Sequence, residues 1–146
     1  MGITKTSRVR IEGIEEMMKN SKAITKASMD VLGKAALAGA DIIRDDARSR
    51  APQKSGNLKR GIISAITWER NTTVAFAGAG MDRNMNNIFV KYSKSGKRYY
   101  YPSSVEYGHK GAPPHPFLRP ALDSNRTKIR KAVADVVKAA IEGASK

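Results

Sequence analysis

The chain has only two histidines, and both are candidate ligands for a metal ion. His109 and His115 lie in a proline-rich segment, where Glu106 is the nearest acidic residue. Zinc needs three or four nitrogen, sulfur or carboxylate ligands, and the chain has no cysteine. The spacing matches no standard zinc site. We therefore expect no metal and interpret both histidines as side chains on the surface of a turn.

Three aspartates are candidate catalytic acids of a hydrolase or nuclease. Asp41 and Asp45 are four residues apart, so on a helix they share a face with Arg44 and Arg48, which can neutralise them. The third candidate, Asp46, lies on the same helix. Two-metal catalysis needs carboxylates that converge from several elements, and no other part of the chain clearly supplies them. A phosphate-binding loop and a nucleophile elbow are also missing. The sequence therefore indicates a solvated helix face, with no catalytic residue, no cofactor and no enzyme activity.

The net charge of +14 favours an anionic partner. The stretches 47–68 and 83–105 each contain five basic residues and no acidic residue. In the second stretch we expect four residues to face a partner or DNA: Lys91, Lys94, Lys97 and Arg98. A nucleic-acid-binding protein is the main alternative, because tyrosines 99–101 could stack on bases. On a strand Tyr100 would then be buried if its neighbours are exposed. Solvated loops and an acidic protein partner also remain open.

Hydrophobic periodicity predicts two long helices. Apolar residues recur at spacings of three and four from residue 15 to about residue 50, and again from about 120 to 142. The first helix is expected to end at Ala51, because the following Pro52 disfavours a helical conformation there. The small residues 38–40 leave a smooth patch on this helix, which another element can approach closely.

Alternating and β-branched residues predict strands at 8–12, 58–69, 73–78, 88–92, 98–101 and 104–107, with loops at 80–87 and 108–116. Strands 58–69 and 73–78 are expected to form one hairpin, and 88–101 a second with a basic tip. The order of elements predicts a single α+β domain over residues 1–146. In it, a long helix of the N-terminal half and a C-terminal helix pack on one face of an antiparallel sheet of about four to five strands. The basic hairpin region, 81–104, is expected to protrude.

No apolar run reaches the roughly 20 residues that a membrane span requires, and the N-terminus lacks the apolar stretch of a secretion signal. Together with the absence of cysteine, this favours assembly in a reducing cytoplasm and no membrane partner.

Two segments have a more specific pattern than the rest of the chain. In the first, Pro52 stops the long helix, Gly56 permits a tight turn and Leu58 begins the next apolar run. We call residues 51–58 the first motif.

The second motif comprises residues 105–109 and 112–122. Glu106 and an aromatic residue precede Gly108, which releases the chain into a segment stiffened by prolines. Phe117 and Leu118 are expected to anchor this segment in the core, and Pro120 suits the first turn of a helix. The motif residues singled out are Pro52, Gly56, Leu58, Glu106, Gly108, Pro116, Phe117, Leu118 and Pro120.

In order and spacing, these motifs resemble the tail-completion or neck family of long-tailed bacteriophages, whose members join head to tail and are often described as minor tail components. The resemblance covers nearly the whole chain, and residues 11–14 fit the opening of the family. The stretch 81–97, which is longer and more basic than we expect, and the pair Pro113–Pro114 depart from it.

The resemblance implies a virion structural protein that joins the head connector to the tail, or completes the tail, by forming an oligomeric ring without catalysis. The implied partners are further copies of the chain in a hexameric ring, connector or head-completion proteins, and tail-tube or tail-terminator proteins. Nonspecific contact with packaged DNA is also expected. The implied location is the neck or tail of the virion, after assembly in the bacterial host cytoplasm.

Overall fold

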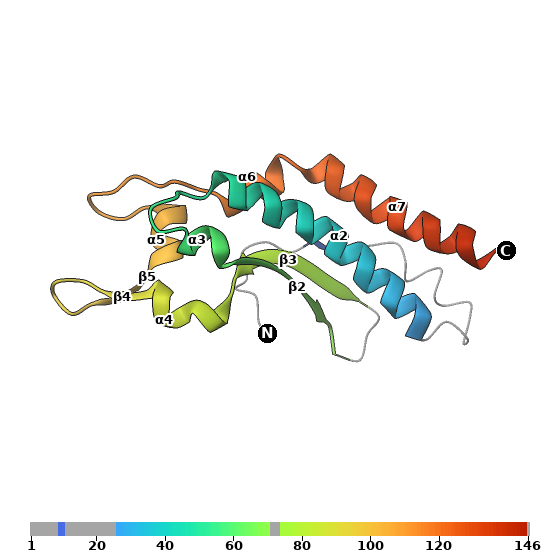
Figure 1. Ribbon diagram of the computed structural model, residues 1–146, viewed down its shortest axis with the longest axis horizontal. Coiled ribbons are helices and arrows are strands. Elements are labelled where there is room, and N and C mark those ends of the chain that lie inside the picture. Colours follow the sequence, from blue (N-terminus) through green and yellow to red (C-terminus); the bar gives the residue numbers. More distant parts are fainter. Residues whose placement is uncertain (1–8, 11–25, 71–73, 146) are drawn as a thin grey trace.

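The computed structural model describes residues 9–10, 26–70 and 74–145 (Figure 1). The first elements in chain order are β1 (Val9–Arg10), α2 (Lys26–Arg50), α3 (Asn57–Arg60), β2 (Ile62–Trp68) and β3 (Ala75–Met81). They are followed by the 3-10 helix η1 (Arg83–Met85), α4 (Asn86–Phe89), β4 (Val90–Tyr92), β5 (Arg98–Tyr100), α5 (Tyr101–Tyr107), α6 (Leu118–Asp123) and α7 (Arg126–Ala144). The predicted helical residues 15–25 lie outside the described residues, as do residues 8, 11 and 12 of the first predicted strand.

The strands form two antiparallel sheets. One sheet has the order β1-β3-β2, and the other pairs β4 with β5. In the larger sheet the register of β2 and β3 runs from Ile62 opposite Met81 to Trp68 opposite Ala75. The class α+β and both hairpins are therefore confirmed, whereas the single sheet of four to five strands is wrong. The physical reason lies after β3, where the Asp82 side chain accepts a hydrogen bond of 2.9 Å from the Asn84 N–H, which caps η1 and turns the chain out of the sheet.

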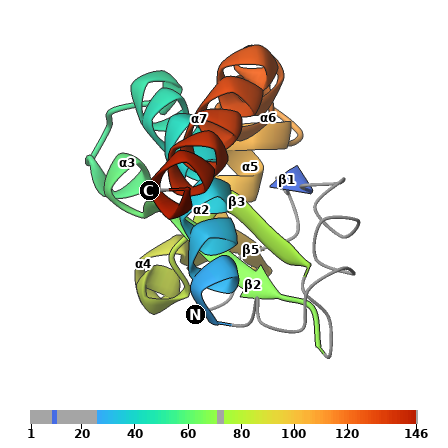
Figure 2. The ribbon, with the colours of Figure 1, turned by 90° about the vertical axis from the view of Figure 1, so that its right-hand side faces the viewer.

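The helix α2 is a central layer between the three-stranded sheet and α7 (Figures 1 and 2). On its sheet side, Ala36 and Ala40 pack against Ala77 of β3. On its other side a Cβ atom added at Gly39 would lie only 3.0 Å from Cγ2 of Ile129 in α7. The predicted close approach at residues 38–40 is therefore confirmed. The expectation that both long helices cover the sheet is wrong for α7, because α2 has small residues on both sides and packs between the two.

The main core lies around the C-terminal half of α2, where the short helices converge. Its largest fully buried side chains come from five different elements or loops: Ile43, Ile62, Met81, Phe89 and Phe117. Leu58 of α3 and Ile129 of α7 complete the same cluster. The short elements of the C-terminal half are therefore held by side chains that reach one shared core. None of the helices in the described ranges is long and apolar enough to cross a bilayer.

Several predicted boundaries are wrong. Residues 58–60, expected to begin a strand, belong to α3, because Gly56 adopts a φ of 72° and turns the chain into a helical turn that buries Leu58. Residues 104–107 belong to α5 instead of a strand. Residues 83–87, expected as loop, and residues 88–89, expected as strand, form η1 and α4. Alternation over four residues does not distinguish a strand from one helical turn.

The final helix is divided into α6 and α7 at Ser124 and Asn125. The buried Asn125 side chain stabilises this break, because its amide donates hydrogen bonds of 2.8 Å to the Ala121 carbonyl and 2.7 Å to Asp46 Oδ2 of α2. The break therefore lets α6 and α7 each pack against α2 at its own angle.

Candidate partner interface

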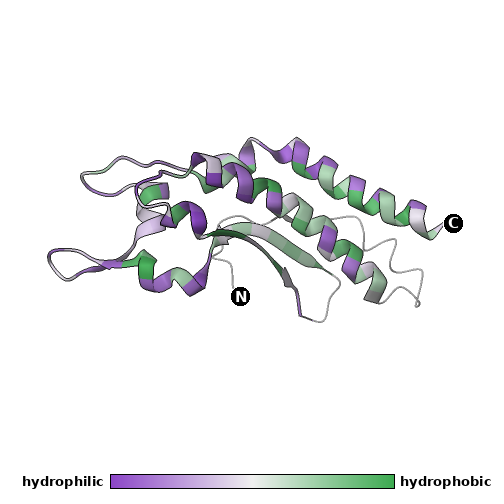
Figure 3. Cartoon of the chain, in the orientation of Figure 1, coloured by the Kyte–Doolittle hydropathy of each residue, from purple (hydrophilic) through white to green (hydrophobic). Residues whose placement is uncertain are grey.

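Three loops lie at one end of the molecule, and we call this region the loop end. It consists of residues 51–56 after α2, residues 93–97 at the tip of the β4–β5 hairpin, and residues 108–116, the proline strap, between α5 and α6. The hairpin and the strap extend beyond the helices in the same direction (Figure 1). Both are hydrophilic, in contrast to the sheet (Figure 3). The three loops contain Lys54, Lys94, Lys97 and Lys110 and no acidic residue.

The first motif holds one side of the loop end in place. The backbone N–H of the buried Ala51 donates a helical hydrogen bond of 2.9 Å to the Ala47 carbonyl, so α2 continues up to the half-buried Pro52. Leu58, only 2% exposed, then fixes the chain in the core again. The exposed residues 53–56 are therefore anchored on both sides.

Glu106 holds the other side together. Its side chain is buried, and Oε2 accepts hydrogen bonds from the backbone N–H groups of Phe117 at 2.8 Å and Leu118 at 3.0 Å. Oε1 accepts a third from Arg119 at 2.9 Å. These N–H groups begin α6 and have no partner within that helix. The carboxylate therefore joins the end of α5 to the start of α6 and closes the proline strap.

Gly108 begins the strap in a conformation that suits only glycine. Its φ is 72° and its ψ is 176°. A Cβ atom at this position would lie 2.7 Å from the Pro114 nitrogen and 3.0 Å from the Ala112 carbonyl oxygen. The strap folds back over Gly108, because His109 and Ala112 exchange two backbone hydrogen bonds of 3.0 and 2.9 Å.

The strap also ends on fixed residues. The His115 N–H donates to the Val105 carbonyl of α5 at 2.8 Å. Phe117 and Leu118 are 0% and 5% exposed, so the predicted anchoring in the core is confirmed. Pro116 is exposed, and Pro120 lies half-buried in the first turn of α6. Glu106, Gly108, Phe117 and Leu118 of the second motif therefore hold the strap in position.

The four basic residues predicted to face a partner lie on the hairpin. Lys91, Lys94, Lys97 and Arg98 are all exposed, and none of them forms an ion pair with a described residue. The tip is closed by the Ser93 N–H, which donates to the Lys97 carbonyl at 2.9 Å. The structure thus presents these charges to solvent on a formed hairpin and brings no acid to them.

The tyrosines beside this charge differ in exposure. Tyr100 packs edge-on against Phe89, with ring centroids 6.1 Å apart, and its burial raises the pKa of its hydroxyl. Tyr99 of the same strand is 40% exposed, and Tyr92 of β4 is 67% exposed. Tyr100 therefore lies on the core side, and Tyr92 and Tyr99 are available for contact. The predicted alternation does not extend to Tyr101, which belongs to α5 and packs partly buried against the core.

The candidate catalytic aspartates are held by hydrogen bonds to neighbouring residues and do not converge on a common site. Arg44 Nη1 lies 2.6 Å from Asp41, and its Nε donates to Asp45 at 2.8 Å, which lowers the pKa of Asp45. Burial opposes the ionisation of Asp46, but hydrogen bonds from Arg50 and Asn125 outweigh it and lower the pKa of Asp46. The described residues contain no group of three side chains suited to a metal ion.

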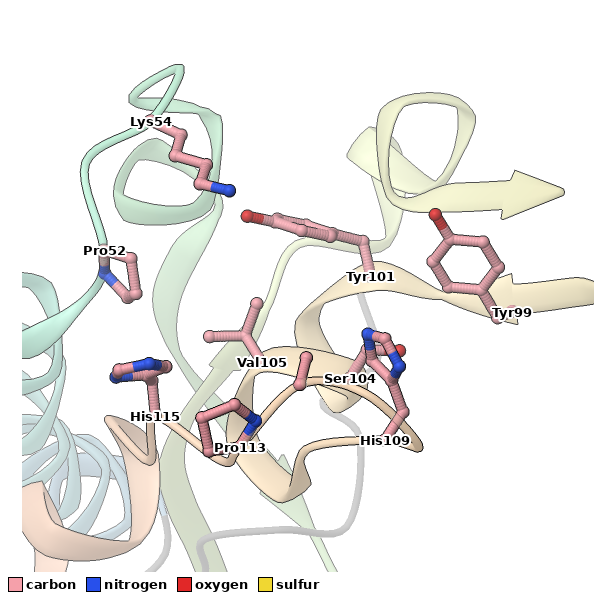
Figure 4. A pocket seen from close by; sticks show the side chains of 10 residues that line it. Pro52, Lys54, Tyr99, Tyr101, Ser104, Val105, His109, Pro113 and His115 are labelled. Carbon is pink, nitrogen blue, oxygen red and sulfur yellow. The ribbon is translucent and has the colours of Figure 1, made fainter. Parts of the chain in front are cut away.

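A pocket of about 370 Å³ lies where the two motifs meet (Figure 4). The first motif contributes Pro52 and Lys54, whereas β5 and α5 contribute Tyr99, Tyr101, Ser104 and Val105. The strap contributes His109, Ala112, Pro113 and His115. The sequence singles out both segments but does not predict this pocket, because the two segments are far apart in the chain.

Comparison with protein families assigns this architecture to a known group. The model of the HK97-gp10-like family, described as "Bacteriophage HK97-gp10, putative tail-component", matches residues 15–108, which is nearly two thirds of the chain. The match includes the first motif and extends through Glu106 to Gly108. No curated protein and no solved structure matched the chain.

The Glu106 carboxylate is expected to be essential for stability. In the Glu106→Gln variant the side chain keeps its size but loses its charge and one acceptor oxygen, so we expect the free energy of unfolding to fall by about 1.5–3 kcal/mol. Urea unfolding measures this change. The control is Glu142→Gln on α7, whose carboxylate is 65% exposed and lies 3.8 Å from Lys138, and which should change stability by less than about 0.5 kcal/mol. Equal effects of the two substitutions would contradict the role of Glu106.

Gly108 and Gly96 test the close approach of the strap. Both have positive φ, 72° and 78°, but a Cβ at Gly96 would meet no atom within 4 Å. Gly96→Ala should therefore cost about 1 kcal/mol for backbone strain alone. Gly108→Ala should cost about 1–3 kcal/mol more, because its ψ of 176° is unfavourable for any residue with a side chain and because the strap must move. Thermal unfolding of the two variants tests this difference, and a Gly108→Ala variant as stable as Gly96→Ala would exclude the close approach.

Proposed function

Because the chain belongs to the HK97-gp10-like family of bacteriophage tail components, we propose that it is a virion structural subunit that joins the head connector to the tail, or completes the tail. It acts as a single-domain subunit of a hexameric ring and is located in the neck or tail. Its function is binding, without turnover of a substrate. The observation that carries the proposal is that the motifs typical of the family meet at one exposed, basic end of the molecule.

Two features of the fold support assembly into a ring. Head-to-tail contacts around a closed ring need two different surfaces on each subunit. The loop end is one such surface, and the free edge of β2 is a second. The backbone groups of β2 alternate between facing β3 and facing away from it. The Asp82 N–H donates to the Gly61 carbonyl at 2.7 Å, so the residues that face β3 are Gly61 and every second residue after it.

The intervening residues of β2 turn their backbone groups away from β3. The Ile62 carbonyl accepts a hydrogen bond of 3.0 Å from Arg48 Nε, whereas those of Ser64, Ile66 and Trp68 have no partner among the described residues. Such an edge can pair with a strand of another chain. The edge thus lies on a different part of the molecule from the loop end, as heterologous contacts require.

The proposal includes no catalytic step, and the polar groups agree with that. Asp41, Asp45 and Asp46 of α2 are each held by hydrogen bonds to neighbouring side chains, and Asp46 and Asn125 connect α2 to the break between α6 and α7. These bonds stabilise the packing of α2. The partners are the connector or head-completion proteins on one side and tail-tube or tail-terminator proteins on the other.

Charge reversal on the hairpin tests the proposal. Phages that carry Lys94→Glu, Lys97→Glu and Arg98→Glu should fail to join heads to tails, because the contact to an anionic partner weakens by about tenfold to a hundredfold. Electron microscopy of the lysate should show separate heads and tails, and the infectious yield should fall. The side chains are exposed, so thermal unfolding of the purified variant should be unchanged.

The matched control reverses three exposed residues on α2 and α7, Lys34, Lys128 and Arg130. Each reversal lowers the net charge by two, so both triple variants carry a net charge of +8 instead of +14. The control should join particles normally. Normal yield from the hairpin variant would refute the contact, and joined infectious particles from a phage that lacks the protein altogether would refute the function.

A stand-alone nucleic-acid-binding protein is the second candidate, favoured by the charge and by the exposed Tyr92 and Tyr99 beside the basic hairpin. It predicts tight DNA or RNA binding whose affinity falls steeply with salt. For a virion subunit we expect only weak, nonspecific binding that disappears at physiological salt. Gel shifts with duplex DNA and single-stranded RNA at about 50 and 200 mM salt compare the two candidates.

A further inference from the structure

The pocket between the two motifs has an apolar interior. Pro52, Val105, Ala112 and Pro113 form its walls, and its volume of about 370 Å³ lies near the lower end of the range of about 300–1,000 Å³ typical of ligand sites. Figure 4 shows Val105 between the strap and the first motif, with its methyl groups directed into the hollow. Such a hollow suits an aliphatic or aromatic side chain of an incoming segment.

Hydrogen-bond donors without partners surround this hollow. The Lys54 ammonium and the Tyr101 hydroxyl point toward one another at one side, and the His115 ring lies at another (Figure 4). None of these three side chains has a hydrogen-bond partner among the described residues. Of the other polar side chains, Ser104 donates to the Tyr100 carbonyl at 3.4 Å and His109 Nδ1 lies 3.0 Å from the Lys110 carbonyl oxygen, whereas the Tyr99 hydroxyl has no hydrogen-bond partner among the described residues.

The lining contains no carboxylate, so the group that fits these donors is an anionic acceptor. A lysine ammonium and a tyrosine hydroxyl together can bind one carboxylate through charge-assisted hydrogen bonds. The pocket thus combines an apolar hollow with a rim that favours negative charge.

An acidic protein segment fits this pocket better than DNA or a second copy of the chain. Binding to a phosphate backbone relies on a row of cations along a groove, whereas only one lysine lines this hollow. In the proposed ring a second copy would meet the loop end with the edge of β2, and Ile62–Trp68 contains no acidic residue that could bind in this pocket. The partner should therefore be a different, acidic protein.

The pocket is also already formed in the free subunit. The strap is fixed by the Glu106 carboxylate, by the paired His109 and Ala112, and by the His115 N–H bond to Val105. The first motif is fixed by Leu58 in the core. A segment that binds here does not have to order the walls, so little binding free energy is lost to conformational entropy.

We propose that this pocket is the docking site for an extended acidic segment of a partner protein in the virion. One carboxylate of the segment binds to Lys54 and Tyr101, and a neighbouring apolar side chain fills the hollow beside Pro52, Val105 and Pro113. This inference rests on the proposed function in one respect, namely that the partner is a virion protein. The chemistry of the site stands on the pocket itself.

The test is an NMR titration of the full-length ¹⁵N-labelled protein. The probe is a pool of acetylated, amidated tetrapeptides in which Asp or Glu alternates with Leu, Val or Phe, and the control pool has Asn or Gln at the acidic positions. The acidic pool should shift the amide resonances of Lys54, Val105, Ala112 and His115, and should bind at least about tenfold more tightly than the control pool. An absence of shifts at these residues, or equal binding of the two pools, overturns the proposal.

Three variants locate the binding. Lys54→Glu should weaken binding of the acidic pool by about tenfold or more, because it replaces attraction by repulsion. Tyr101→Phe keeps the ring and removes only the hydroxyl, so binding should weaken by about threefold to tenfold. Lys59→Glu makes the same charge change on exposed α3, outside the pocket lining, and should leave affinity within about twofold of the unmodified protein. Equal losses for Lys54→Glu and Lys59→Glu would reduce the effect to net charge and overturn the site.

A ten-nucleotide single-stranded DNA serves as the competing probe. If this DNA displaces the peptides and shifts the same resonances at physiological salt, the pocket is assigned to nucleic acid instead.

Failure of this proposal can be distinguished from failure of the proposed function. If phages with Lys54→Glu join particles normally and the pool does not bind, only the docking site is refuted. If the pool binds but loss of the protein does not affect joining, the virion function is refuted and the peptide site remains.

Discussion

The packing of the C-terminal half of the chain depends on the buried carboxylate of Glu106. The start of α6 presents three backbone N–H groups in a region where Phe117 and Leu118 must be buried, and an unsatisfied buried N–H costs about 1–3 kcal/mol. Because Glu106 satisfies all three, the apolar anchors can enter the core without that penalty. The same bonds fix both ends of the strap, so one wall of the pocket at the loop end and part of the core depend on a single side chain.

The helix α2 makes a similar connection on the other side of the molecule. Ala36 and Ala40 allow the sheet to approach, and Gly39 allows α7 to approach, so one helix serves as the contact surface for two layers. The polar residues of α2 then add specificity, since Asp46 binds Asn125 at the break between α6 and α7 and Arg48 binds the Ile62 carbonyl at the start of β2. The arrangement of the elements around α2 thus follows from small residues and a few directional bonds.

The sequence was sufficient to predict features that depend on local pattern. The periodicity of α2, the β2–β3 hairpin, the patch at Gly39 and the anchors Phe117 and Leu118 are all local, and the structure confirms them. The short helices α3 and α5 were missed, because one helical turn has no distinctive period. The division into two sheets and the pocket were missed because both depend on which distant segments meet. The local pattern singled out Glu106 but not its role, because its three hydrogen bonds depend on residues 117–119, which lie more than ten positions away in the chain. The role of Lys91, Lys94, Lys97 and Arg98 remains a prediction.

The free edge of β2 has a consequence for the timing of assembly. Outward-facing backbone groups at Ser64, Ile66 and Trp68 form a template for any extended strand, including the same strand of another copy. With a charge of +14 on each copy, encounters between free subunits are repulsive, so long-range electrostatics disfavours pairing at this edge. An anionic surface that gathers several copies cancels this repulsion and raises their local concentration. In the ring that we propose, the charge that opposes pairing in solution would therefore let edge pairing begin on the particle.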